Sequence, residues 1–219
     1  GFGTIFLKKG YSLQRTYALS KLESAMMPAI QVGLLVLVVT APAFIFFSQK
    51  GPGAMHAPWL ISLAAGLVVG GLSQFSRLCT VGGFRDLFLF KKSILIFGYL
   101  AVLIGVFVVN ISFGNFHLGF ENQPIAHTDG LWNFLGMALA GFCSVLLGGC
   151  PLRQLIMTGE GNSDSAVTVL GLAAGAAFAH NFGLAATGAG PTLNGEIAVG
   201  VGFVVALIIA ILNTKRVNA

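Results

Sequence analysis

The chain has 219 residues, of which 56% are hydrophobic and only 9% are charged. A soluble domain carries about 25% charged residues, so this composition excludes a soluble globular enzyme. The high content of Phe, Leu, Val and Ile also excludes a disordered chain. The formal net charge of +5 comes from basic residues that mostly flank apolar segments, which indicates membrane topology rather than a nucleic-acid partner. We therefore expect a polytopic membrane protein.

Residues 1–25 are polar and basic, and we interpret them as a cytoplasmic linker ahead of a membrane transport domain over 26–219. A membrane-spanning helix needs about 20 predominantly apolar residues. Six segments fit that requirement: 26–48, 59–76, 93–112, 131–148, 165–187 and 196–213. Pro42 lies inside the first of them and predicts a kink there. The predicted fold class is all-α.

Two short apolar segments, 79–90 and 150–158, lie between these spans. Each follows a Gly-rich helix, starts at a cysteine and is too short to cross a bilayer, which is typical of re-entrant half-helices. The order of long helix, cysteine, short helix and long helix occurs twice, which predicts an internal repeat with units of about 59–112 and 132–187. Repeats of this kind often build a transport site at their interface.

The basic residues predict how the chain lies across the membrane. They are Lys8, Lys9, Arg15 and Lys21 before the first span, Arg77, Arg85, Lys91 and Lys92 between the second and third, Arg153 between the fourth and fifth, and Lys215 and Arg216 after the sixth. The loops 113–130 and 188–195 contain no Lys or Arg, and the loop 49–58 has only Lys50. By the positive-inside rule both termini are cytoplasmic in an inner (plasma) membrane.

The second short segment carries the most specific pattern, Gly-Gly-Cys-Pro-Leu-Arg-Gln over 148–154. Proline at the first helical position favours a helix start, so we expect Cys150 at the N-cap. Gly148 and Gly149 let the backbone turn sharply and approach a ligand. A helix N-terminus offers free N–H groups and a partial positive charge. The pattern therefore predicts a soft thiol beside a backbone that attracts anions.

Cys79, with Gly82 and Gly83 after it, is the equivalent position in the first short segment. A neutral thiol is a weak donor and acceptor that suits polarizable sulfur or selenium. Weak binding also allows a permeating ion to leave again. Three cysteines cannot close a complete disulfide framework, so free thiols are expected.

Further residues are candidates for the substrate pathway, each with a structural alternative. Cys143 is either a second pore residue or a core residue. Arg77 and Arg153 either draw anions into a cytoplasmic funnel or anchor the topology. His180 and Asn181 form a polar pair inside the fifth span, where they either line the pore or bridge helices.

The stretch 159–164 joins the second short segment to the fifth span. Ser163 or Asp164 is expected to cap that span. Glu160 is an alternative candidate for a cytoplasmic exit.

No Walker A, HExxH or GxSxG motif is present, so the sequence gives no support to ATP hydrolysis or to these hydrolase classes. We expect no enzymatic activity, no cofactor and no metal. The polar residues of the 113–130 loop match no metal-ligand spacing and are interpreted as solvated: His117, Glu121, His127 and Asp129.

Two motifs, SRLCTVGGFRD (76–86) and GGCPLRQLIMTGEGNSD (148–164), resemble the YeeE/YedE family of membrane proteins. FENQPIAHTDGLWNFLGM (120–137) and GAAFAHNFGLA (175–185) are similar to its YedE branch, regarded as selenium transporters. The resemblance implies re-entrant helices, pore cysteines at Cys79 and Cys150, and a small cytoplasmic sulfur-carrier protein as a partner. It also implies relatives about twice this length. We therefore expect this chain to correspond to their second half, working with a first half or as a homo-oligomer.

The leading hypothesis is a transporter that imports a sulfur- or selenium-containing compound past Cys79 and Cys150. A membrane-bound sulfur-transfer subunit that uses a cysteine persulfide is the first alternative. A soft-metal transporter is the second, although the five methionines form no regular motif. The sequence does not distinguish sulfur from selenium and does not identify a coupling ion.

Overall fold

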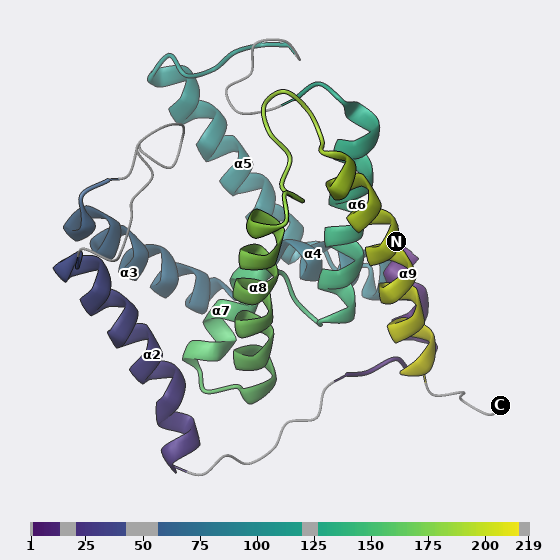
Figure 1. Ribbon diagram of the computed structural model, residues 1–219, viewed down its shortest axis with the longest axis horizontal. Coiled ribbons are helices and arrows are strands. Elements are labelled where there is room, and N and C mark those ends of the chain that lie inside the picture. Colours follow the sequence, from purple (N-terminus) through teal and green to yellow (C-terminus); the bar gives the residue numbers. More distant parts are fainter. Residues whose placement is uncertain (1, 14–20, 43–56, 120–126, 215–219) are drawn as a thin grey trace.

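The computed structural model describes residues 2–13, 21–42, 57–119 and 127–214 (Figure 1). Within these ranges the regular structure is helical and contains no strand. The helices are α1 (Phe2–Lys8), α2 (Lys21–Thr40), α3 (Trp59–Ser76), α4 (Thr80–Phe90), α5 (Ile94–Ser112), α6 (Gly130–Leu146), α7 (Pro151–Gly159), α8 (Ser163–Asn181) and α9 (Leu193–Leu212). Both predicted short segments are helices that begin directly after a cysteine. The predicted all-α fold is confirmed.

Four helical stretches of the described chain are long and apolar enough to cross a membrane: Trp59–Phe90, Ile94–Ser112, Gly130–Gly159 and Leu193–Leu212. Six spans were predicted, and helices occupy all six places, but two do not meet this criterion. The apolar part of α2, Ala25–Thr40, is shorter than a full span. Helix α8 is diluted by polar residues at both ends, from Ser163 to Ser165 and at His180 and Asn181.

The first predicted span, 26–48, differs from the structure at both ends. Helix α2 already begins at Lys21 and ends at Thr40. Pro42 does not kink the helix but follows its end, with Ala41 at a φ of 40°. A proline disfavours helical geometry in the residue before it, which explains this termination. Residues 43–48 lie outside the described residues, as do Arg15, Lys50, Lys215, Arg216 and the 120–126 part of the third motif.

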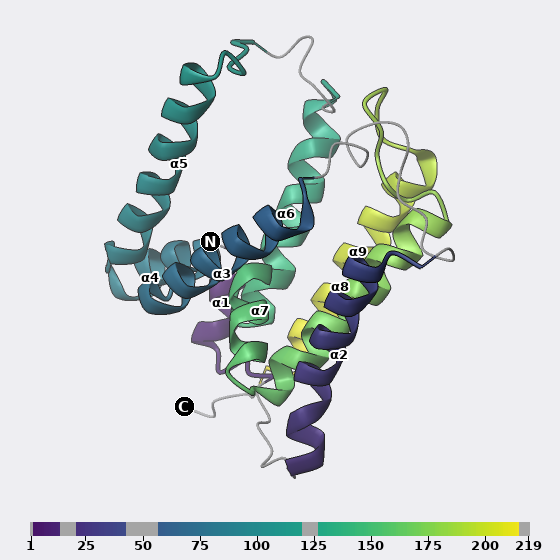
Figure 2. The same cartoon turned by 90° about the vertical axis from the view of Figure 1, so that its left-hand side faces the viewer.

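The helices form a loosely packed assembly with the short helices near its middle. Helix α7 packs against α8, α4 against α5, and α6 against α9, while α2 and α3 each contact α7. Figure 1 shows α2 and α3 on one side and α6 and α9 on the other, with α7 and α8 between them. Figure 2 shows α5 standing well apart from α8 and α9.

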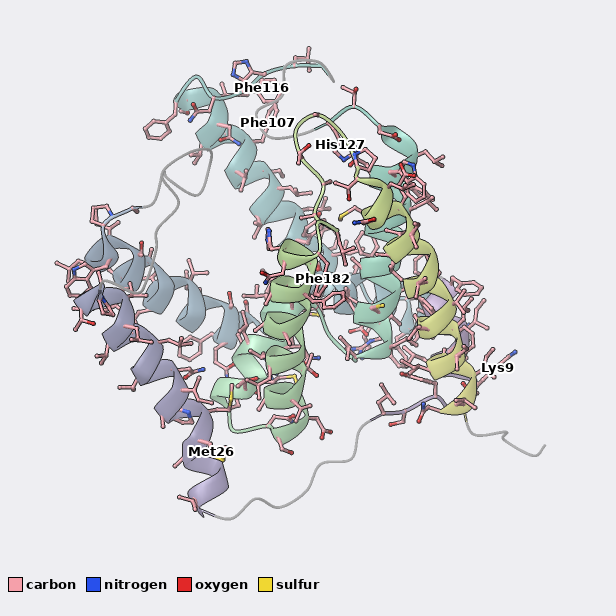
Figure 3. All side chains as sticks on the ribbon, viewed as in Figure 1. Lys9, Met26, Phe107, Phe116, His127 and Phe182 are labelled. Atoms are coloured by element: carbon pink, nitrogen blue, oxygen red, sulfur yellow. The ribbon has the colours of Figure 1, made fainter. Side chains whose placement is uncertain are left out.

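Helix α5 illustrates why so many apolar side chains remain exposed. It is strongly apolar, yet none of its residues is buried within the protein. Phe116, just after the helix, turns back onto Phe107 with ring centroids 5.1 Å apart (Figure 3). A bilayer or another apolar helix covers such a surface at no hydrophobic cost, which explains why it can stay exposed within this chain.

The main apolar cluster lies where α1, α6 and α9 meet, and the sequence did not predict it. Its buried members are Tyr11, Phe142, Leu146, Ala206 and Ala210. Rings from α1 continue the cluster, since Phe2 and Phe6 have centroids 5.7 and 6.1 Å from that of Phe142. Part of the expected 1–25 linker is therefore a helix packed on the membrane domain. The reason is the four-residue spacing of its two phenylalanines, which places both rings on one helix face.

Candidate functional site

Cys79 caps the first short helix. Helix α3 ends at Ser76, and the backbone turns through Arg77, whose φ of 51° and ψ of 32° are left-handed. Cys79 is extended and its Sγ accepts a hydrogen bond from the Gly82 backbone N–H at 3.2 Å. A thiol here takes the place of the oxygen that usually satisfies the free N–H groups of a helix start.

The second short helix starts as the sequence predicted. Gly148 has a φ of +79°, a left-handed conformation that glycine adopts at little cost. Cys150 is the N-cap of α7 and Pro151 is its first helical residue. The loop before the cysteine is held by Gln154, which is only 3% exposed and donates from Nε2 to the Leu147 carbonyl at 2.9 Å.

The two helix starts meet at one sulfur atom. The backbone N–H of Cys150 donates to Cys79 Sγ at 3.3 Å. Cys79 Sγ therefore accepts an N–H from its own helix and one from the start of α7. In return, the Cys150 thiol lies beside Thr80 and the backbone N–H of Arg153. Both cysteines are buried, at 6% and 5% exposure, and both are free thiols.

This arrangement concentrates partial positive charge around soft atoms. Each helix start carries about half a positive charge from its aligned peptide dipoles, and the two starts converge. Sulfur is polarizable and makes long, weak hydrogen bonds. The site is thus able to receive a polarizable anion that replaces the cysteine sulfur as acceptor.

A polar link joins the same two helical units at the other end of α7. Gln74, in the last turn of α3, donates from Nε2 to Glu160 Oε1. The other carboxylate oxygen, Glu160 Oε2, lies 3.5 Å from Nη2 of Arg153. Nη1 of Arg153 is buried and has no hydrogen-bond partner among the described residues. The link therefore leaves Nη1 of the guanidinium without a partner in the described part of the chain.

A cavity of about 590 Å³ borders the loop that leads to Cys150. Leu147, Gly148 and Gln154 form its wall on that side. The rest of the lining includes Tyr11, which follows α1, and Arg85 of α4. Two further cavities, of about 330 and 260 Å³, are smaller. Its position makes it a candidate vestibule of the cysteine site.

The remaining predicted residues lie apart from the sulfur contact. Cys143 is half-buried and packs against the cluster around Tyr11. Arg77 is exposed at the end of α3. His180 and Asn181 are exposed at the end of α8, where Asn181 Nδ2 donates to the Ala177 carbonyl at 2.7 Å. Among the described residues no hydrogen bond connects any of these four to Cys79 or Cys150.

Two details of the motif region differ from expectation or were missed. Asn162, not Ser163 or Asp164, caps α8, because its side chain accepts from the Ser165 N–H at 2.9 Å. Sequence reasoning also overlooked Gln154 and Gln74. The signal for Gln154 was its place four residues after an N-cap cysteine, on the face that returns to the preceding loop. No signal existed for Gln74, whose partner is 86 residues away.

The fold and the site define a class: a polytopic helical membrane protein in which two cysteine-capped short helices meet, as in transporters with broken helices. The chain belongs to the sulphur transport family, whose model matches residues 75–215. The match covers both short helices and all three cysteines and confirms the YeeE/YedE resemblance at the family level. The protein is accordingly a multi-pass sulfur transporter in general terms. Comparison with curated proteins and with solved structures gave no match.

Proposed function

We propose that the protein imports a sulfur- or selenium-containing anion through the inner membrane, past Cys79 and Cys150. One observation carries this proposal: Cys79 Sγ accepts N–H groups from the starts of both short helices. A terminal sulfur or selenium atom of a substrate has similar size and softness, so it can take over the same donors. Thiol donors bind it weakly enough for onward passage.

The charge pattern supports an anionic substrate. The N-termini of α4 and α7 lie at the two cysteines. Arg153 of α7 adds a positive charge, and the carboxylate of Glu160 is engaged by Arg153 and Gln74. A neutral thiol adds no negative charge of its own. Uncharged compounds gain nothing from this field, so selectivity for anions follows from electrostatics.

Uptake measured in cells that lack their own importers tests the proposal. Labelled thiosulfate and selenium compounds are supplied in competition to cells expressing the wild type, Cys79→Ala, Cys150→Ala or Cys143→Ala. We expect uptake to fall at least tenfold in the first two variants and to stay within about twofold in Cys143→Ala, which alters the apolar cluster only. Equal amounts of protein in the membrane are verified for each variant. Full-rate uptake by the Cys79→Ala/Cys150→Ala double variant contradicts the proposal.

The proximity of the two thiols favours one other function, a sulfur-transfer subunit. A Cys150 thiolate would attack the outer sulfur of thiosulfate, forming a cysteine persulfide and releasing sulfite, and a thiol carrier would then take the sulfur. Atoms and charge balance without an added oxidant. Mass spectrometry of protein incubated with thiosulfate decides between the two: a persulfide on Cys150 with stoichiometric sulfite supports transfer, and unmodified cysteines with saturable uptake support transport.

A further inference from the structure

Glu160 is placed to control the charge of the cysteine site. It caps the C-terminal end of α7, seven residues after Arg153, so both side chains lie on one face of the helix, about two turns apart. One carboxylate oxygen lies 3.5 Å from Arg153 Nη2, and the other accepts from Gln74 of α3. A single carboxylate thus neutralises the arginine and ties the end of α3 to α7.

The guanidinium of Arg153 retains capacity for a second anion. Its side chain is 19% exposed, and Nη1 is buried with no partner among the described residues. An unpaired buried donor is costly and calls for an explanation. The planar guanidinium of arginine can donate hydrogen bonds to different anions through its different N–H groups. Glu160 lies beside Nη2, and Nη1 has no partner among the described residues.

The stem of Arg153 begins beside the loop that carries Cys150. The Cβ and Cγ of Arg153 lie 3.4 Å from the point where a side chain on Gly149 would begin. Its backbone N–H lies beside the Cys150 thiol. The side chain thus starts at the cysteine loop and ends at Glu160. An anion that leaves the thiols along α7 toward Glu160 would therefore pass this guanidinium.

We propose that Glu160 is the internal counter-ion of Arg153 and sets how tightly the pathway holds a permeating anion. The inference rests on the proposed function and deepens it. Without the carboxylate, Arg153 carries a full uncompensated charge, so an anion binds tightly and leaves slowly. With it, the anion competes with Glu160, and binding stays weak enough for passage.

Glu160→Gln tests this, because glutamine preserves the shape and can still accept from Gln74. The matched control is Asp129→Asn, which removes the same charge from the N-cap of α6, where asparagine can still accept from the Trp132 N–H. We expect Glu160→Gln to lower the Kd and the KM for thiosulfate by about five- to tenfold, the size of one charge–charge interaction at close range screened as in water, and to lower the maximal uptake rate. Asp129→Asn should change KM by less than about twofold.

Two further variants and a neutral ligand distinguish an effect of the Glu160 charge from an effect on the structure. Gln74→Ala removes the tie to α3 but no charge, so KM should stay unchanged. Arg153→Gln should abolish the gain when combined with Glu160→Gln. Binding of thiourea, a neutral sulfur compound, should not respond to Glu160→Gln. The inference is overturned if Glu160→Gln and Asp129→Asn behave alike, if the gain survives without Arg153, or if thiourea binding changes equally.

The outcomes also distinguish this inference from the proposed function. If the wild type takes up thiosulfate and Cys79→Ala does not, but Glu160→Gln leaves Kd and KM unchanged, only the counter-ion assignment fails. If purified wild-type protein neither binds thiosulfate nor mediates its uptake, the transport proposal fails and the counter-ion assignment falls with it.

Discussion

At the scale of single residues, the site depends on how closely a few small groups approach one sulfur atom. Gly82 donates its N–H to Cys79 Sγ at 3.2 Å. A side chain at position 82 would begin only 3.2 Å from Cys79 Cβ and 3.3 Å from Sγ. These spacings are tighter than ordinary van der Waals contact, so the sulfur would have to move. Glycine at this position therefore determines where the thiol sits.

Gly82→Ala tests that geometry. We expect it to displace Cys79 Sγ from the N–H of Cys150, to cost about 1–3 kcal/mol of stability through overpacking, and to reduce uptake several-fold. Gly105→Ala is the matched control, because a side chain at position 105 of α5 meets no atom within 4 Å. Uptake assays and thermal unfolding in detergent measure both variants. Wild-type uptake by Gly82→Ala would show that the thiol position is not critical.

The sequence predicted those parts of the site that depend on local pattern. Cys150 could be assigned to an N-cap because Pro151 follows it, and Gly148 to a turn because glycine tolerates a positive φ. The sulfur contact between Cys79 and Cys150 could not be predicted, since it links positions 71 residues apart. The same holds for the link between Gln74 and Glu160. Such pairs are determined by how helices pack, which no local spacing encodes.

At the scale of elements, α1 and the residues after it pack on the membrane domain instead of forming a linker. Tyr11, three residues after α1, is 5% exposed, and its hydroxyl has no hydrogen-bond partner in the described part of the chain. Burial raises the pKa of Tyr11 to about 12, with a smaller contribution from Cys143. The hydroxyl thus contributes little to the packing of α1 on α6 and α9, while the ring contributes its apolar area.

Tyr11→Phe should therefore leave the protein as stable as the wild type at pH 8, within about 1 kcal/mol. The variants should diverge at high pH. Below pH 10 the tyrosine is protonated in both folded and unfolded chains, so stability does not depend on its titration. Between pH 10 and 12 the unfolded chain loses the proton first, so the wild type loses stability as pH rises. Thermal unfolding at pH 8 and pH 11 compares the two, and an identical loss in both variants contradicts the assignment.

Helix boundaries were predictable wherever an apolar run met a strong stop or start signal. Helices α3 and α5 match the predicted spans 59–76 and 93–112 within a residue. The first span was less predictable, because an apolar run continues across Pro42 although the helix cannot. Helix α1 was missed for the opposite reason, since seven residues are too few to show a periodic pattern and its stability comes from packing on Phe142.

At the scale of the whole molecule, one end lacks basic residues. The segment after α5, the start of α6 and the loop between α8 and α9 lie together at one end, with Phe116 and His127 marking it, whereas Lys9 and Met26 lie toward the other (Figure 3). The described residues 113–119, 127–130 and 182–192 include no Lys or Arg. By the positive-inside rule this pattern supports the proposal that the Lys9 end lies in the cytoplasm.

Single cysteines report this orientation directly. Leu118→Cys and Lys9→Cys are placed in a chain whose three native cysteines are replaced by alanine. Leu118 is 91% exposed, and Lys9 is also exposed. A membrane-impermeant maleimide should label position 118 in intact cells and position 9 only after lysis. The reverse pattern would invert the proposed topology, and export would then replace import as the expected direction.

The sulfur of Cys79 is shared by both short helices, and this limits the number of anions that one chain can bind. Because one atom satisfies an N–H group from each helix start, a ligand atom that displaces it gains both donors at once. The two short helices therefore provide one binding site and not two. Saturation should be hyperbolic with a stoichiometry of one anion per chain, and passage should be strictly single-file.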